Sequence, residues 1–120
     1  MSKTIIAAVD DMFFASKIRA TAEHLGLTVK FVRSVQAAIE GARQESPSLI
    51  IADLHSQRCE PLDLVRALKA VDELRNIPII GFFSHVETAL QAAAQDAGYD
   101  RVVPRSAFSN NLAQILNGEF

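Results

Sequence analysis

Residues 49–54 read Leu49-Ile50-Ile51-Ala52-Asp53-Leu54, a short apolar run that ends at a carboxylate. A continuous apolar run of this length is typical of a strand buried on both faces, as in a parallel sheet under helices. The carboxyl end of such a strand opens onto the edge where parallel sheets bind ligands. We therefore expect Asp53 to be the chemical centre of the protein.

The rest of the chain alternates apolar runs with helical patterns. Apolar runs predict strands at residues 4–9 and 79–83, and shorter or more exposed strands fit residues 28–33 and 101–103. Phe13 and Phe14 are adjacent on a predicted helix, so they cannot both face the core. Apolar spacing and end signals predict helices between Asp11 and Gly26, from Ser34 to about Glu45, from Pro61 through Val71, from about Val86 to Ala97, and from Ser109 as N-cap to Gly118.

Five strands alternating with five helices predict an α/β fold with helices on both faces of a parallel sheet. The favoured arrangement is flavodoxin-like, (βα)5 and doubly wound, with strand order 2-1-3-4-5. That order brings the carboxyl ends of the first and third strands together, so Asp10 and Asp11 should meet Asp53. Ser84 follows the fourth strand and Arg105 the fifth, at the same edge.

Length and composition limit the classes of function. A chain of 120 residues fits one domain, spanning residues 1–120. A net charge of −2 with scattered basic residues argues against nucleic acid or anionic membrane as a partner. The single cysteine, Cys59, gives no disulfide and no zinc spacing, which suits the reducing cytoplasm. The N-terminal apolar run is too short for a signal peptide or a membrane span, and no output domain is expected.

Three neighbouring carboxylates, those of Asp10, Asp11 and Asp53, repel one another. At an effective dielectric constant of about 20, each pair at ~4 Å costs about 4 kcal/mol unless a cation relieves it. An all-oxygen ligand set suits Mg²⁺. A bound Mg²⁺ can hold a phosphoryl oxygen, and an aspartate can attack phosphorus. Ser84 and Arg105 are then expected to take the remaining phosphoryl oxygens.

These residues resemble the motifs of bacterial response-regulator receiver domains, over essentially all 120 residues. Val9-Asp10-Asp11 is similar to the family's acidic pair, Ala52-Asp53-Leu54 to its phospho-acceptor, and Phe83-Ser84 to its Thr/Ser position. Arg105 stands where the family carries a lysine. The resemblance implies a stand-alone, Mg²⁺-dependent phosphoprotein of a two-component or phosphorelay pathway. It implies that Asp53 receives the phosphoryl group of a histidine kinase or phosphotransfer protein and that a downstream protein target reads the shape change. It implies no conventional enzyme activity beyond self-phosphorylation and self-dephosphorylation.

Other functions remain open at this point. Arg105 in place of lysine, His85 after Ser84, and the loop of residues 55–61, which lacks the family's usual pattern, favour a pseudo-receiver. A pseudo-receiver signals through protein–protein contacts without phosphorylation. A phosphatase or nucleotide-binding domain of the same architecture is less well supported. No glycine-rich phosphate loop follows the first strand.

Each candidate residue also has a structural alternative. Asp11 is expected to be the closer metal ligand, and helix capping is the main alternative for Asp10. Ser84 fits an N-cap of the helix that follows it, and Arg105 fits a surface ion pair. His55 fits either a solvated loop residue or a metal ligand through its backbone carbonyl. The sequence does not decide between a monomer and a homodimer.

Overall fold

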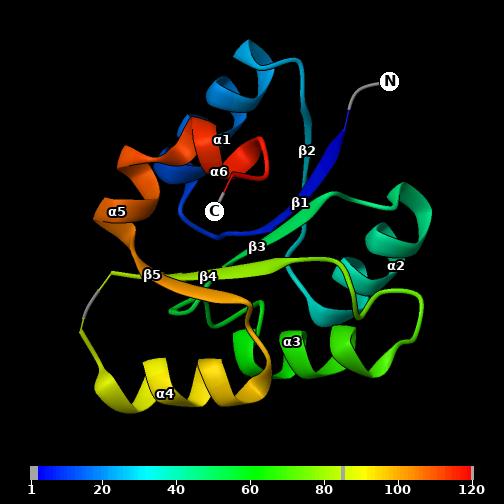
Figure 1. Ribbon diagram of the computed structural model, residues 1–120, viewed down its shortest axis with the longest axis vertical. Helices are drawn as coiled ribbons and strands as arrows, with labels where there is room; N and C mark the ends of the chain where they lie inside the picture. The colour runs from blue at the N-terminus through cyan, green and yellow to red at the C-terminus, as the bar shows by residue number, and fades with distance from the viewer. Residues whose placement is uncertain (1–2, 85, 120) are drawn as a thin grey trace.

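The computed structural model describes residues 3–84 and 86–119, which form a five-stranded parallel sheet with helices on both faces (Figure 1). The strand order is β2-β1-β3-β4-β5, which confirms the predicted flavodoxin-like class and order. The strands are β1 (Thr4–Ala8), β2 (Thr28–Phe31), β3 (Leu49–Asp53), β4 (Ile79–Phe83) and β5 (Arg101–Pro104). The helices are α1 (Met12–His24), α2 (Val35–Glu45), α3 (Pro61–Ala70), α4 (Thr88–Ala97), α5 (Arg105–Asn110) and α6 (Leu112–Leu116).

Two apolar layers, one on each face of the sheet, hold the helices. On one face, α2, α3 and α4 lie side by side and pack on Ile6, Ile50 and Ile79 (Figure 1). On the other, α1, α5 and α6 pack on Ile51 and Phe82. Successive residues of a strand point to opposite faces, so a sheet buried on both faces needs uninterrupted apolar strands. This explains why β1, β3 and β4 read as continuous apolar runs.

Phe14 anchors the start of α1 in the core. Its ring centroid lies 5.0 Å from that of Phe82 and 5.8 Å from that of Phe108, and Phe82 stacks on Phe108 at 4.9 Å. Phe13, one position earlier, has 91% of its surface exposed. The expectation that only one of these two phenylalanines faces the core is confirmed. The aromatic cluster ties α1 and α5 to the central strands, next to the carboxyl edge of the sheet.

The C-terminal helical region differs from the prediction. Ser109 does not cap the last helix, because it lies inside α5, which begins at Arg105 directly after Pro104. Pro104 has φ −64°, a value set by its ring that suits the entry to a helix, and Phe108 is fully buried one turn later. The helix then ends at Asn110, and a separate short helix, α6, buries Leu112, Ile115 and Leu116. Burial of Phe108 explains why helical structure begins at Arg105, before Ser109. The sequence prediction did not include Phe108 among the apolar residues of the last helix.

Two other boundaries shift by a few residues. α4 begins at Thr88 instead of Val86, with Glu87 at its N-cap. β2 ends at Phe31, although the backbone N–H of Val32 still donates to Ala7 O at 3.0 Å. The other end signals act as expected: Ser34 Oγ accepts from Ala37 N at 3.0 Å, and Pro61 opens α3.

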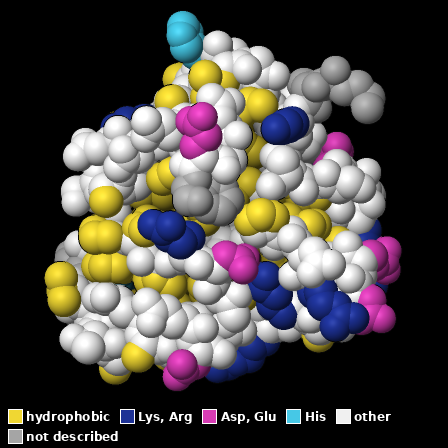
Figure 2. Space-filling view, viewed as in Figure 1, with side chains coloured by type: hydrophobic (Ala, Val, Ile, Leu, Met, Phe, Trp, Pro, Cys, Tyr) yellow, Lys and Arg dark blue, Asp and Glu magenta, His cyan; other side chains and the backbone are white. Residues whose placement is uncertain are grey.

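β2 and β5 are the edge strands of the sheet, and both are only four residues long. β5 ends at the exposed Pro104, which has no backbone N–H. β2 carries Lys30 near its middle. On the face seen in Figure 2, basic and acidic side chains are interspersed. Within the described part of the chain, no helix has the length and apolarity needed to cross a membrane.

Candidate functional site

The register of the sheet brings the predicted acidic residues to one edge. β1 pairs with β3 so that Ala8 lies opposite Ala52, and Asp10 follows β1 by two residues. Asp53 is the last residue of β3 and lies opposite Phe82 of β4. The two carboxyl ends therefore meet side by side, as the predicted topology requires.

Asp53 is half-buried at the end of β3. Its Oδ1 accepts a hydrogen bond from the backbone N–H of His55 at 2.9 Å. Loss of solvation raises the pKa of the Asp53 carboxyl above its usual value, and the negative charge of Asp10 acts in the same direction. The hydrogen bond from His55 and the positive charge of Arg105 oppose this rise in pKa. Asp53 is thus a partly desolvated carboxylate next to charges of both signs, and its environment penalises the bare anion.

Asp11 is the N-cap of α1. Its Oδ1 accepts from the backbone N–H groups of Phe13 at 2.9 Å and Phe14 at 3.1 Å. Its Oδ2 accepts from Arg105 Nη2 at 3.0 Å. The hydrogen bond from the Phe14 N–H lowers the pKa of Asp11 most, and the Arg105 guanidinium lowers it further. The capping role considered for Asp10 belongs to Asp11 instead.

Asp10 points toward the loop between β3 and α3. Its Oδ2 accepts a hydrogen bond from Ser56 Oγ at 2.7 Å, and its Oδ1 lies 3.8 Å from Cys59 Sγ. The same sulfur lies 3.5 Å from Val32 O, so its single proton can serve only one of the two acceptors at a time. The Ser56 hydroxyl in turn accepts from the backbone N–H of Cys59 at 3.1 Å. This network connects the end of β1 to the loop that follows Asp53.

Arg105 reaches the edge from the first turn of α5. Its guanidinium carbon lies 4.4 Å above the centroid of the Phe14 ring, in addition to its ion pair with Asp11. The ion pair considered as an alternative role for Arg105 is therefore present. Stacking on an aromatic face while pairing with a carboxylate uses the planar guanidinium in a way that an ammonium group does not reproduce. Arg105 also lines an open hollow of about 490 Å³ together with Phe13 and Lys17.

Ser84 and His55 complete the set of predicted site residues. Ser84 is exposed and directly follows β4, and it does not cap α4, whose N-cap is Glu87. His55 is half-buried, and its backbone N–H donates to Asp53 Oδ1. His85, one of the features that favour a pseudo-receiver, lies outside the described residues. The roles of Ser84 and Arg105 toward a phosphoryl group, and of the His55 carbonyl toward a metal, stay predictions.

The donor atoms at this edge suit a hard divalent cation, because they are carboxylate oxygens from three residues. Within residues 3–84 and 86–119, however, no three His, Cys, Asp or Glu side chains are grouped so that they could hold a metal ion. Asp10 is engaged by Ser56, and Asp11 by its cap bonds and Arg105. The ligand chemistry therefore fits Mg²⁺, whereas the observed orientations do not form a ready-made cage.

Ser56 and Tyr99 support this edge, and sequence reasoning missed both. Tyr99 is buried, and its hydroxyl donates to Pro61 O at 2.7 Å. Burial raises the pKa of the Tyr99 phenol far above its usual value, so the group stays neutral and can donate. A serine three residues after Asp53, in a loop short enough to fold back on the strand ends, is the signal that could have identified Ser56. For Tyr99, the signal is a lone tyrosine between Gly98 and a strand.

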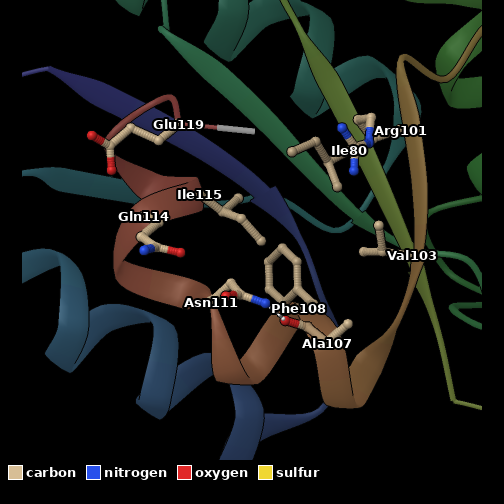
Figure 3. A pocket seen from close by; sticks show the side chains of 9 residues that line it. All are labelled: Ile80, Arg101, Val103, Ala107, Phe108, Asn111, Gln114, Ile115 and Glu119. Atoms are coloured by element: carbon tan, nitrogen blue, oxygen red, sulfur yellow. Dashed lines mark hydrogen bonds between the residues drawn. The ribbon is translucent and has the colours of Figure 1, made fainter.

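A second hollow, of about 220 Å³, lies between the sheet and the last two helices (Figure 3). Ile80, Phe108 and Ile115 give it an apolar lining, and Arg101 and Glu119 lie on opposite sides of it (Figure 3). None of the predicted site residues lines this hollow. It is therefore separate from the acidic edge.

Comparison with known proteins gives a class for this fold and site. A scan against models of protein families finds no match. The chain is 30% identical over 80 residues to the polar-differentiation response regulator DivK of Brucella ovis, an alignment that covers 67% of this chain and 65% of DivK, just under two thirds of that relative. Among solved structures, a response regulator from Hahella chejuensis matches with a TM-score of 0.86 at 19% identity, covering 99% of this chain and 96% of that one. The Mn²⁺-bound form of response regulator Rcp1 matches with a TM-score of 0.76 at 16% identity, covering 97% and 90%.

The solved structures share the fold, and the DivK alignment adds a relationship in sequence. The chain is thus similar in sequence to a response regulator over 67% of its length and has the fold of response-regulator receiver domains, in agreement with the resemblance of its motifs.

Proposed function

We propose that this protein is a stand-alone receiver that accepts a phosphoryl group on Asp53 in a Mg²⁺-dependent reaction. The observation that carries the proposal is the environment of Asp53. It is a half-buried carboxylate at the carboxyl edge of the sheet, within the electrostatic influence of both Asp10 and Arg105. Burial makes its bare anion unfavourable, and formation of an acyl phosphate converts this carboxylate into a neutral carbonyl while adding about two negative charges on the phosphoryl oxygens. Arg105 and a bound cation would offset those charges.

The proposed reaction transfers a phosphoryl group from phosphohistidine to Asp53. A carboxylate oxygen of Asp53 forms the new O–P bond while the N–P bond of the donor breaks, and the leaving imidazole takes up a proton from solvent. The carboxylates of Asp10, Asp11 and Asp53 would hold the Mg²⁺ ion, and the backbone carbonyl of His55 would be a further oxygen ligand. When bound, Mg²⁺ would supply positive charge to the phosphoryl oxygens.

Arg105 and Ser84 would contact the phosphoryl oxygens that remain. Arg105 can do so only by giving up or sharing its ion pair with Asp11, which spans 3.0 Å between Nη2 and Oδ2. Release of Asp11 by Arg105 would at the same time make an oxygen of Asp11 available to a cation. The proposal thus links two events, binding of the ion and movement of Arg105.

The proposed partners are a histidine kinase or phosphotransfer protein, which donates the phosphoryl group, and a downstream protein that reads the resulting change of shape. Support comes from the family relationship and from the Mn²⁺-bound neighbour, whose name records a divalent ion. A cytoplasmic location is part of this proposal, since a free, buried Cys59 thiol suits a reducing compartment.

The direct test is mass spectrometry of the intact protein after incubation with acetyl phosphate, with and without Mg²⁺. One adduct of about 80 Da is expected only when Mg²⁺ is present. Asp53→Asn should abolish it, whereas Asp96→Asn, which alters an exposed carboxylate on α4, should leave it unchanged. An adduct that persists in Asp53→Asn would contradict the proposed acceptor.

A pseudo-receiver is the second candidate, and a specific observation favours it. Asp10 and Asp11 both have their oxygens engaged by protein groups, which suits a domain that does not use a metal. In that case the downstream partner should bind Asp53→Ala as tightly as the unaltered protein, and the acetyl phosphate adduct should be absent. Partner affinity and adduct formation measured on the same variants separate the two candidates.

A further inference from the structure

Ser56 connects the loop after β3 to Asp10 at the end of β1. With 6% of its surface exposed, it is as buried as Tyr99, and among the described residues it is the one buried side chain that is polar without an apolar ring. Its hydroxyl donates to Asp10 Oδ2 at 2.7 Å and accepts from the backbone N–H of Cys59 at 3.1 Å. A serine hydroxyl has one proton, so its donation is committed to Asp10. The loop therefore uses a buried hydroxyl to orient one carboxylate of the acidic edge.

The three carboxylates are held in different ways. Asp11 is fixed by two backbone N–H groups at the start of α1 and by Arg105. The backbone N–H of His55 holds Asp53. Asp10 is held by side chains of the β3–α3 loop. Of the three, Asp10 is the carboxylate that can turn without disturbing a helix cap or the end of a strand.

A divalent ion needs such a turn. Mg²⁺ requires oxygen ligands at about 2.1 Å in near-octahedral geometry. The described residues do not bring three ligating side chains together, so at least one carboxylate must reorient. We propose that Ser56 is a positioning residue that holds Asp10 in its ion-free orientation and thereby weakens binding of the divalent ion. This inference rests on the metal site of the proposed function, and it adds a residue that sets the affinity of that site.

The experiment measures binding of Mn²⁺ to the full chain by electron paramagnetic resonance of the free ion, with Mg²⁺ as competitor. Phosphorylation is not involved in this measurement. Ser56→Ala removes the hydroxyl, and Ser56→Thr retains one at the same position. Gln57→Ala is the matched control, because Gln57 is the exposed neighbour of Ser56 in the same loop.

Ser56→Ala should bind Mn²⁺ about threefold to tenfold more tightly, a range set by the net contribution of one hydrogen bond in water. Ser56→Thr and Gln57→Ala should bind it within about twofold of the unaltered protein. A purely structural role for Ser56 predicts the opposite result, since a loosened loop would weaken the site. Unchanged or weaker Mn²⁺ binding by Ser56→Ala would overturn the inference.

A second measurement covers the case in which Ser56→Ala fails to fold after the Cys59 N–H loses its acceptor. In the unaltered protein, titration with Mg²⁺ should shift the amide resonances of Ser56 and Cys59 together with that of Asp10. Shifts at Asp10 without shifts at Ser56 and Cys59 would overturn the inference. Absence of ion binding in every variant would instead contradict the metal site of the proposed function. Divalent-ion binding with the same affinity in the Ser56 variants and the unaltered protein would overturn the inference about Ser56 and leave the proposed function intact.

Discussion

Asp11 and Asp53 lie at the same edge of the sheet, yet their surroundings shift their pKa values in opposite directions. Backbone N–H groups and Arg105 favour the anion of Asp11 and lower its pKa. Burial disfavours the anion of Asp53 and raises its pKa. The side chains are identical, so the difference comes from where the chain places hydrogen-bond donors. Asp11 is therefore suited to a permanent structural charge, whereas the anion of Asp53 is held at a cost in free energy.

Replacing Asp11 should separate its capping role from its charge. Asp11→Ala loses the acceptor for the Phe13 and Phe14 N–H groups and should lower the free energy of unfolding by about 1 kcal/mol. Asp11→Asn keeps a carbonyl oxygen at the cap and should cost clearly less. Urea unfolding at pH 7 measures both changes. Asp96→Ala, on an exposed face of α4, controls for loss of a carboxylate, and equal losses in both Asp11 variants would contradict the capping role.

Asp53→Asn should stabilise the protein at neutral pH. The pKa of Asp53 is higher in the folded than in the unfolded state, so its anion costs folding free energy above the folded pKa. That cost disappears as the pH falls below the unfolded value, near 4, where the carboxyl is protonated in both states. The variant should therefore unfold roughly 2–5 °C higher at pH 7 and lose this advantage near pH 3. Thermal unfolding followed by circular dichroism across this range checks the prediction, and an advantage that grows toward pH 3 would refute it.

Gly81 shows how closely the connecting segments pack over β4. A Cβ atom at this position would lie 2.8 Å from Leu54 Cδ2 and 3.1 Å from Tyr99 Cδ1. Both neighbours belong to segments outside the strands, one following β3 and the other preceding β5. Glycine is needed here because these segments approach the backbone closely. Its backbone φ angle is not in the left-handed region, so conformational freedom is not the reason.

Gly81→Ala should destabilise the protein by about 1–3 kcal/mol through overpacking. Leu54→Ala alone should also destabilise it, by leaving a cavity. The double variant should lose less than the two single losses added together, because the smaller residue at position 54 makes room for the new methyl group. Chemical unfolding of the four proteins gives this cycle directly. Strict additivity would show that the two side chains do not compete for the same space.

Strong apolar patterns made most helices and strands predictable. The apolar runs that form β1, β3 and β4 are continuous because helices cover both faces of each strand. The alternation of such strands with helices predicted a doubly wound parallel sheet and its strand order. The start of α5 was missed because the decisive contact, Phe108 against Phe82, joins residues distant in sequence. The local capping signal at Ser109 was weaker than this tertiary contact.

The same reasoning reached the residues of the acidic edge, but not their orientations. Topology alone requires Asp10 and Asp53 to be neighbours, since β1 and β3 are adjacent. Whether Asp10 faces an ion or a hydroxyl depends on how the β3–α3 loop folds, and a loop has no periodic pattern to read. For this reason the sequence pointed to the carboxylates and missed Ser56.

Binding of a divalent ion should stabilise the molecule as a whole, because the unfolded chain does not assemble the three carboxylates. At ten times its dissociation constant, the ion adds about 1.4 kcal/mol to the free energy of unfolding. The melting temperature should therefore rise with added MgCl₂, and EDTA should reverse the rise. NaCl at equal ionic strength is the control for screening. A rise of the same size in Asp53→Asn and Asp10→Asn would place the ion elsewhere.

The short outer strands have a consequence for storage at high concentration. β5 ends in a proline that cannot donate a backbone hydrogen bond, and β2 places a lysine on the other outer strand. Such features hinder the alignment of strands from separate molecules that starts fibril growth. We expect concentrated samples to resist amyloid formation as long as the domain stays folded.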